Sequence, residues 1–251
     1  MMKILVNCGP AEQYITRCLE SILAQRFADW EAYVTIDPCS DSTGDLARLA
    51  ARAEPRIHVH QNEERLFTMA NVLHGVERSG AQPEDVIVIL DGDDWFATPE
   101  ALRTIHAAYL QTDCWMTYGS WMPDRPVMPG CWPAYPDGLT DFRNHTWLGT
   151  AVRTWKRWLW DLIDDRDFRD EDGRYFRVTE DQATMFPMLE MSGTAKARHI
   201  PEVLMIYNRS SPHACAATRR EEMLANSEYL KKRPPYERLA AKPVLFPAGT
   251  R

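Results

Sequence analysis

The chain has 251 residues, of which 45% are apolar and 26% charged, so it is long enough for one folded domain and its composition excludes global disorder. A formal net charge of −7 disfavours a general nucleic-acid-binding protein. Six dispersed cysteines without a C-x-x-C pair exclude a zinc ribbon, argue against a disulfide framework and favour reduced thiols.

The ends of the chain add two expectations. No apolar run reaches the ~18 residues of a membrane span, and the apolar N-terminal run is too short for a signal peptide. We therefore expect a cytoplasmic protein without a membrane span. The charge is unevenly distributed, because residues 1–195 carry 18 basic and 31 acidic residues, whereas residues 196–251 carry 11 and 5. A basic tail thus follows an acidic body.

The first half of the chain alternates strand-like and helix-like segments. We predict strands at residues 3–7, 32–37, 57–60 and 86–90. We predict helices at residues 15–23, 42–49, 66–76 and 98–110. The last strand is entirely apolar, which is typical of a buried strand in a parallel sheet. This alternation indicates βαβ units and an α/β fold with a mostly parallel sheet.

The second half has a weaker pattern. Residues 119–147 are rich in Pro, Gly, Trp and Tyr and show no period, and so long an irregular segment is usually functional. Within it, Trp121 and Trp132 either stack on a sugar ring or pack inside the loop. Further on, we predict helices at residues 152–163, 179–191 and 216–230, a strand at 203–207, and an extended tail.

The sharpest chemical signal is a cluster of acidic residues, Asp91, Asp93 and Asp94, directly after the most apolar strand. Ligands of parallel sheets bind beyond the carboxyl ends of strands. Neighbouring carboxylates repel one another unless a cation such as Mg²⁺ or Mn²⁺ compensates their charge. The alternative is an Asp-Gly turn that leads into a helix. The chain contains neither G-x-x-x-x-G-K-[ST] nor G-x-G-x-x-G, so phosphate would have to bind by another route.

Three segments in this order, YITRCLESILAQRFADWEAYVTID, SDST and VIVILDGDDWFATPEAL, resemble the N-terminal half of family 2 glycosyltransferases of the GT-A fold. The resemblance covers residues 3–110 and includes the Asp-x-Asp (DXD) motif. It implies a three-layer α/β/α GT-A-like domain over residues 1–251 with a mostly parallel central sheet. Residues 1–112 would bind a nucleotide-sugar, residues 113–215 would form the acceptor side, and residues 216–251 a C-terminal helix and basic tail.

The resemblance also implies roles for individual residues. Asp37 would hydrogen-bond the nucleotide base, and Cys8 would meet the base through backbone atoms. Asp91 would reach the ribose or the metal shell, and Asp93 would bind Mn²⁺ or Mg²⁺. The family's Pro-x-Tyr-Asn after the first strand is replaced here by residues 7–10, Asn-Cys-Gly-Pro, which leaves the identity of the base open.

Three further positions carry two interpretations each. Asn62 stands where the family often has the Asn of an Asn-x-Gly segment, but the glycine is replaced here. Arg65 either contacts the donor phosphates or begins a solvated helix, and we favour the latter. His213, after the last predicted strand, is either a third metal ligand or a loop histidine.

The expected catalytic base lies in the segment Thr179-Glu180-Asp181-Gln182. On its own this segment reads as a capping box, with Thr179 as the N-cap and acidic residues at a helix start. The family pattern places Glu-Asp at the start of this helix and so favours Asp181 as general base, with Glu180 as its supporting neighbour.

The expected function is transfer of a sugar from a nucleotide-diphospho-sugar, with a UDP-sugar favoured, to an acceptor hydroxyl, with inversion. The alternatives are a sugar nucleotidyltransferase and a non-catalytic carbohydrate-binding protein on the same fold. The acceptor is a glycan or, as a speculative alternative, a hydroxylated base in viral DNA. The latter would use the basic tail, whose members are Arg219, Arg220, Lys231, Lys232 and Arg233.

Overall fold

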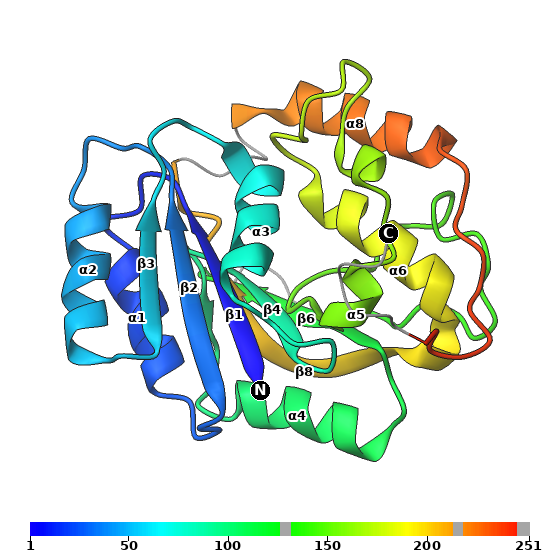
Figure 1. Cartoon of the computed structure of the whole chain (residues 1–251), viewed down its shortest axis with the longest axis horizontal. Coiled ribbons are helices and arrows are strands. Elements are labelled where there is room, and N and C mark those ends of the chain that lie inside the picture. The colour runs from blue at the N-terminus through cyan, green and yellow to red at the C-terminus, as the bar shows by residue number, and fades with distance from the viewer. Residues whose placement is uncertain (126–131, 213–217, 245–251) are drawn as a thin grey trace.

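A computed structural model gives the structure of residues 1–125, 132–212 and 218–244. An eight-stranded sheet runs through the molecule in the order β3-β2-β1-β4-β7-β6-β8-β5. Helices cover both of its faces (Figure 1). The fold class is therefore α/β, as expected from the sequence.

The first half forms a parallel sheet of four strands. They are β1 (Met2–Cys8), β2 (Trp30–Ile36), β3 (Ile57–Gln61) and β4 (Val86–Asp91). β1 is central, pairs in parallel with both β2 and β4, and is buried at every position. Because all four strands run in one direction, the polar residues that follow them meet at one edge of the sheet.

The connecting helices are α1 (Ile15–Leu23), α2 (Thr43–Ala53), α3 (Phe67–Arg78) and α4 (Ala101–Gln111). Each confirms a predicted helix to within four residues at either end, although α4 begins after Pro99 rather than before it. α1 and α2 contact each other, whereas α3 packs on β1 and β2 and covers the opposite face (Figure 1). This arrangement follows from right-handed crossovers, because the strand order reverses between β3 and β4.

The second half adds antiparallel pairs to the sheet. Its strands are β5 (Trp95–Phe96), β6 (Met116–Pro123), β7 (Thr154–Lys156) and β8 (Ala197–Tyr207). β7 is antiparallel to β4 and β6, β5 is antiparallel to β8, and β6 and β8 are parallel. The prediction of a mostly parallel sheet therefore holds, with these three antiparallel pairs added.

Three predictions for the second half were wrong in part. The helix predicted at residues 152–163 is the strand β7 followed by the four-residue helix α5 (Arg157–Trp160). Thr154 shares a hydroxyl hydrogen bond of 2.7 Å with Thr117 of β6, and this pairing overrides the helical spacing of the tryptophans. The segment predicted to be irregular from residue 119 begins inside β6, and the strand predicted at 203–207 is the end of the longer β8.

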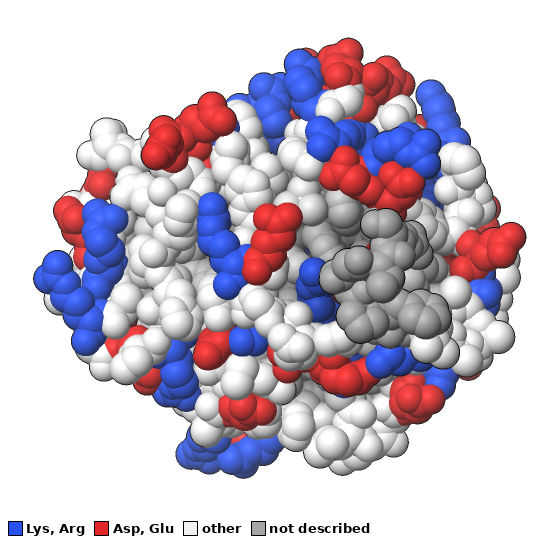
Figure 2. Space-filling view, viewed as in Figure 1, with Lys and Arg blue, Asp and Glu red and all other residues white. Residues whose placement is uncertain are grey.

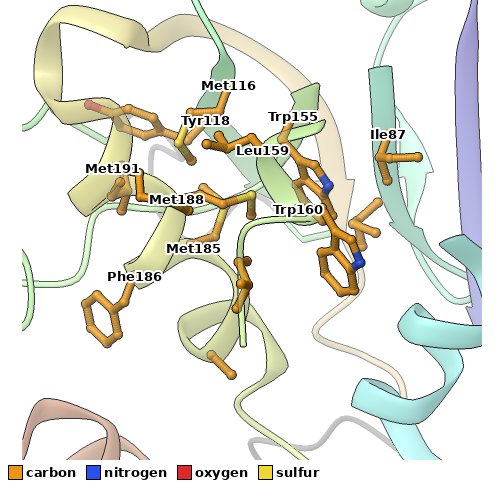
Figure 3. Packing of buried hydrophobic residues seen from close by; sticks show 14 of the residues in the cluster. Ile87, Met116, Tyr118, Trp155, Leu159, Trp160, Met185, Phe186, Met188 and Met191 are labelled. Atoms are coloured by element: carbon orange, nitrogen blue, oxygen red, sulfur yellow. The ribbon is translucent and has the colours of Figure 1, made fainter. Parts of the chain in front are cut away.

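The predicted helix at 179–191 is confirmed as α6 (Glu180–Lys196), and a short 3-10 helix, η1 (Asp165–Phe168), precedes it. The faces of α6 and β7 meet in an apolar core that includes Met185, Met188 and two stacked indoles (Figure 3). The rings of Trp155 and Trp160 lie 5.7 Å apart at an interplanar angle of 7°. Ile87 of β4 and Val72 of α3 belong to the same core, which therefore joins the second half to the parallel half.

The basic C-terminal segment packs on the acidic body. α8 (Arg220–Lys232) covers part of the predicted helix 216–230, and the residues after it pack through Tyr236 and Leu239 against the core. Arg233 pairs with Asp167 and Lys242 pairs with Glu84. None of the described helices combines the length and apolarity needed to cross a bilayer.

Candidate functional site

A cleft opens at the carboxyl ends of β1, β2 and β4. One wall comes from the loops after these strands, and the other from residues around β7 and the start of α6 and α8. The cleft lies where ligands of open parallel sheets bind. Seven of the residues singled out from the sequence for nucleotide, metal or base roles line it together, namely Cys8, Asp37, Arg65, Asp91, Asp93, Glu180 and Asp181.

The acidic segment after β4 forms a tight turn against β1. The Gly92 N–H donates to the Asn7 carbonyl at 2.9 Å, and the Asp94 N–H donates to the Asp91 carbonyl at 2.9 Å. A Cβ atom at Gly92 would lie 2.1 Å from the Cys8 Sγ, so only glycine fits this approach. The turn holds Asp91 and Asp93 at the cleft and directs Asp94 inward, where its Oδ1 accepts from the Asn208 N–H at 2.8 Å.

The opposite wall carries Glu180 and Asp181 at the start of α6. Arg153, which follows the irregular segment and is 8% exposed, places its Nη1 3.4 Å from the Glu180 Oε1. The Asp181 carboxyl accepts hydrogen bonds from the Gln182 N–H, at 2.8 Å, and from the Trp147 side chain. A guanidinium and an indole thus hold the two acidic side chains from behind.

The capping-box interpretation of this segment was wrong. Thr179 makes no side-chain cap and adopts a left-handed backbone conformation with φ of 72°. Among the described residues, Thr179 and Phe67 are the two non-glycine residues with positive φ, and both line the cleft. Strained backbone of this kind is found preferentially at functional sites.

The electrostatics of the cleft reflect its crowded carboxyls. Burial, and then the nearby Glu180, raise the pKa of Asp181 to about 6 and that of Asp91 to about 7. Burial lowers the pKa of Arg153, but the charges of Glu180, Asp181 and Asp91 outweigh this effect and raise it. Arg153 therefore stays charged and offsets part of the negative charge.

Asp37 accepts hydrogen bonds from three groups of the protein in addition to lining the cleft. Its Oδ1 accepts from Asn62 Nδ2 at 2.9 Å and from the Leu66 N–H at 3.0 Å, and its Oδ2 accepts from the Phe67 N–H at 3.0 Å. Asp37 thus fixes the start of α3 while it faces the cleft. Asn62 does not line the cleft and instead links Asp37 to Asn71, whose Oδ1 lies 2.8 Å away. We therefore correct the expectation for Asn62, which supports Asp37 from behind.

The other three predicted positions differ from one another. Cys8 is 4% exposed and lines the cleft, and burial followed by Asp93 raises the pKa of its thiol. Arg65 is exposed and also lines the cleft, where its guanidinium lies 4.6 Å from the Phe67 ring centre, so its two interpretations stay predictions. His213 lies outside the described residues.

Asp91 and Asp93 fit a divalent cation in number and chemistry. Mg²⁺ typically takes one or two carboxylates and leaves its other positions to phosphate and water. Burial and then the nearby Glu180 raise the pKa of Asp91, and a cation beside this carboxyl would favour its charged form. Within the described ranges, no three His, Cys, Asp or Glu side chains form a metal site by themselves. A cation here would therefore need oxygen ligands from the substrate.

Sequence reasoning missed Arg153, Trp147 and the inward direction of Asp94. The signal for Arg153 was a single basic residue within the apolar and β-branched run at residues 151–155. Of the two tryptophans predicted as candidates for stacking on a sugar ring, Trp121 lines the cleft. Trp132 packs against Trp121, with 5.8 Å between the ring centres. Nothing in the spacing of the tryptophans distinguished Trp147 from the others.

Comparison with known proteins agrees with this geometry. Residues 4–170 match the family described as Glycosyl transferase family 2. The putative glycosyltransferase EpsH of Bacillus subtilis (strain 168) is 29% identical over 113 residues, which are 45% of this chain and 31% of that protein. The chain thus corresponds to about a third of the length of this relative.

Solved structures share the fold at low sequence identity. S. aureus TarS 1–349 in complex with UDP-GlcNAc has a TM-score of 0.61 and 17% identity over 86% of this chain and 61% of that one. The mannosyltransferase PcManGT from Pyrobaculum calidifontis, in complex with GDP-Man and Mn²⁺, has a TM-score of 0.65 and 17% identity over 93% of this chain and 65% of that one. The sheet, the cleft and the family match lead to one conclusion: the chain belongs to glycosyltransferase family 2 and has the GT-A fold.

Proposed function

We propose that the protein transfers a sugar from a nucleotide-diphospho-sugar to an acceptor hydroxyl, with a divalent cation and with inversion at the anomeric carbon. The observation that carries this proposal is the pairing of two acidic groups across one cleft. Asp91 and Asp93 lie at the end of β4, and Asp181 lies at the start of α6. This family assignment disfavours a sugar nucleotidyltransferase and a non-catalytic binding protein.

The donor would bind with its base near Asp37 and its diphosphate near Asp91 and Asp93. Asp37 accepts three hydrogen bonds from protein groups and still lines the cleft, so its lone pairs toward the cleft are available to a base N–H. A UDP-sugar is our favoured donor, because TarS is solved with UDP-GlcNAc, although PcManGT is solved with GDP-Man.

The cation, Mn²⁺ or Mg²⁺, would supply positive charge to the departing diphosphate. Two solved structures that share the fold, PcManGT at 17% identity and GalNAc-T7 at 10% identity with a TM-score of 0.61, are complexes with Mn²⁺, which supports its use here. In this chain Asp91 and Asp93 would hold it, while Asp94 keeps the turn in place through Asn208. Whether His213 joins them stays a prediction.

Asp181 would accept the proton of the acceptor hydroxyl. A carboxylate is a weak base in water, but the pKa of Asp181 is raised to about 6 by burial and by Glu180, which brings it closer to that of an efficient base at neutral pH. The Trp147 indole donates to the carboxylate and holds it in position, while Arg153, paired with Glu180, offsets the negative charge beside it. Trp121, on the same wall, offers an aromatic face for an acceptor sugar.

Metal dependence is tested by nucleotide binding. We expect Asp93→Asn to weaken UDP binding in Mn²⁺ by at least about tenfold, because it removes one of two carboxylate ligands. Isothermal titration with and without EDTA measures this, and Asp137→Asn, an exposed residue away from the cleft, is the matched control. Equal affinity for wild type and Asp93→Asn, or full binding in EDTA, would contradict the proposal.

The donor itself is identified by a panel of UDP-, GDP- and other nucleotide-sugars, scored for slow hydrolysis in Mn²⁺. A family 2 enzyme should hydrolyse one donor class faster than the others even without its acceptor. If no nucleotide-sugar is bound or hydrolysed, the proposed reaction is wrong.

A further inference from the structure

Three arginines surround one phenylalanine at the mouth of the cleft. The guanidinium carbons of Arg65, Arg219 and Arg177 lie 4.6, 4.8 and 5.4 Å from the centre of the Phe67 ring. All four residues line the cleft, and they come from three separate segments of the chain. Figure 2 shows Lys and Arg side chains along the upper edge of the molecule, over the start of α8. We call Arg65, Arg177, Arg219 and Phe67 the arginine cluster.

Hydrogen bonds from side chains to backbone carbonyls tie the three segments to one another. The Thr68 hydroxyl donates to the Arg177 carbonyl at 3.0 Å, which ties α3 to the segment before α6. The Asn226 side chain donates to the Val178 carbonyl at 3.3 Å, which ties α8 to the same segment. Phe67 is held in its left-handed conformation by the Asp37 carboxylate. The arginines are therefore brought together by the fold and not by chance side-chain positions.

The arginine cluster has an excess of positive charge. Glu222 accepts from both Arg177 and Arg219, at 2.9 Å each. Within the described part of the chain, Arg65 forms no ion pair with a carboxylate. Among the described residues, Glu222 is the carboxylate that forms ion pairs with Arg177 and Arg219. Three guanidinium groups against the carboxylates of Glu222 and of Asp37, which accepts from the Phe67 N–H, leave an excess of one positive charge, which suits an anion such as a phosphate group.

We propose that the arginine cluster is a second anion subsite of the cleft, which binds a phosphate group carried by the acceptor. Planar guanidinium groups suit bidentate contacts to phosphate oxygens, and Phe67 holds their faces in place. The subsite rests on the proposed function, because it assigns the donor diphosphate to Asp91 and Asp93. It identifies the acceptor as a phosphate-bearing molecule.

The position of the arginine cluster separates it from the donor diphosphate. Phe67 is hydrogen-bonded to Asp37, which follows β2, whereas Asp91 ends β4. β2 and β4 lie on either side of β1, so their ends are about 10 Å apart, or two strand spacings. Arg177 lies four residues before Asp181, the proposed base, so the arginine cluster joins the Asp37 side of the cleft to the segment that leads into α6.

The test measures inorganic phosphate binding while the donor subsite is filled with UDP and Mg²⁺. Phosphate should bind wild type, at an ionic strength held constant with KCl, and Arg65→Gln should weaken this binding at least about fivefold. Glu222→Gln should strengthen it, because it releases two guanidinium groups from their carboxylate. Arg48→Gln, an exposed arginine paired with Asp45, is the control.

A second measurement separates the two proposals. UDP affinity in Mg²⁺ should change less than about threefold in Arg65→Gln, because the donor diphosphate lies elsewhere. If UDP affinity falls together with phosphate affinity, the arginine cluster belongs to the donor and the inference is overturned. If phosphate binds all four proteins equally or not at all, it is also overturned. Failure of the proposed function would instead appear as loss of UDP binding by wild type.

Discussion

Arg153 balances the charge of the cleft more than any other described residue. It lies among Glu180, Asp181 and Asp91, and it is almost fully buried. Without it, three carboxyl groups would share one poorly hydrated space, and some would be protonated at neutral pH. The residue therefore keeps the proposed base ionised and Glu180 in place.

The raised pKa values predict how stability depends on pH. The carboxyls of Asp181 and Asp91 have pKa values of about 6 and about 7, against an ordinary 3.8. Between about pH 4 and pH 7 these two carboxyls are therefore more protonated in the folded state than in the unfolded state. Because the folded state binds more protons in this range, the contribution of the two carboxyls to the free energy of unfolding falls as pH rises. Asp181→Asn removes one such group and should stabilise the free protein at pH 7.5 by on the order of 1 kcal/mol.

Urea unfolding at pH 5 and pH 7.5, in EDTA and without nucleotide, measures this difference. Surface carboxyls such as Glu54, whose pKa is lowered to about 2 by hydrogen bonds from Arg56, have the opposite pH dependence. The free energy of unfolding of the variant is therefore compared with that of wild type at the same pH. An Asp181→Asn variant that gains nothing at pH 7.5 relative to pH 5 would show that the carboxyl titrates normally.

Gly92 gives a second prediction at this scale. Its added Cβ would meet the Cys8 Sγ at 2.1 Å, so Gly92→Ala should lower the free energy of unfolding by about 1–3 kcal/mol. Replacing Cys8 by Ala as well removes the sulfur and should restore part of this loss. Gly9→Ala, whose Cβ meets nothing within 4 Å, is the control in the same loop region. Additive costs in the double variant would mean that the turn is not packed as described.

At the scale of elements, the first half of the fold was predictable because local and tertiary signals agree there. β1 to β4 and α1 to α4 each have the period or apolar run of their type, and short connections separate them. The second half was not, because β7 has only three residues and owes its conformation to β4 and β6 on either side. The tryptophan spacing at residues 155–160 follows a helical period, but only α5 is helical.

The same contrast applies to the site. Asp37, Asp91, Asp93 and Asp181 follow or begin regular elements, so their motifs were visible along the chain. Arg153 and Trp147 come from the irregular segment and its end, and only tertiary folding brings them to Asp181. The arginine cluster joins three distant segments, so no pattern of residue spacing could indicate it.

A buried ion pair joins α6 to the segment before β7 and to the C-terminal tail. Arg143 Nε donates to Glu190 at 2.5 Å, and the two side chains are 5% and 2% exposed. The Tyr236 N–H also donates to Glu190, at 3.0 Å. Removing one partner of a buried pair leaves the other charge without compensation, so Glu190→Gln should cost about 3–5 kcal/mol.

Chemical denaturation of Glu190→Gln and of Glu228→Gln measures this cost. Glu228 pairs with Lys231 on the surface and is 64% exposed, so its variant should differ from wild type by less than about 0.5 kcal/mol. If the two variants are equally stable, the tail is not anchored through this pair.

At the scale of the whole molecule, the uneven charge has a structural explanation. Arg233, Arg238 and Lys242 of the basic tail contact Asp167, the Glu190 carbonyl and Glu84 of the body. These tail residues already have partners, which weakens the idea that the tail recruits an anionic polymer. The excess positive charge that faces the cleft lies in the arginine cluster, to which the tail contributes only Arg219 among the described residues.

The two halves of the molecule divide the proposed reaction between them. The parallel half offers Asp37, Asp91 and Asp93 for the donor, and the mixed half offers Asp181, Glu180 and Trp121 for the acceptor. The central claim is therefore that loss of the base affects transfer without affecting donor binding.

That claim is tested most directly by comparing Asp181→Asn with wild type in two measurements, UDP affinity in Mn²⁺ and turnover of the donor identified by the panel. General-base catalysis contributes typically ~10²–10⁴-fold, so turnover should fall by roughly that factor while UDP affinity stays within about threefold. Glu180→Gln should cost less, because Glu180 only positions its neighbour. Near-full turnover by Asp181→Asn, with turnover lost in Glu180→Gln or in a variant of Asp165 or Asp167, would contradict the account and place the base elsewhere.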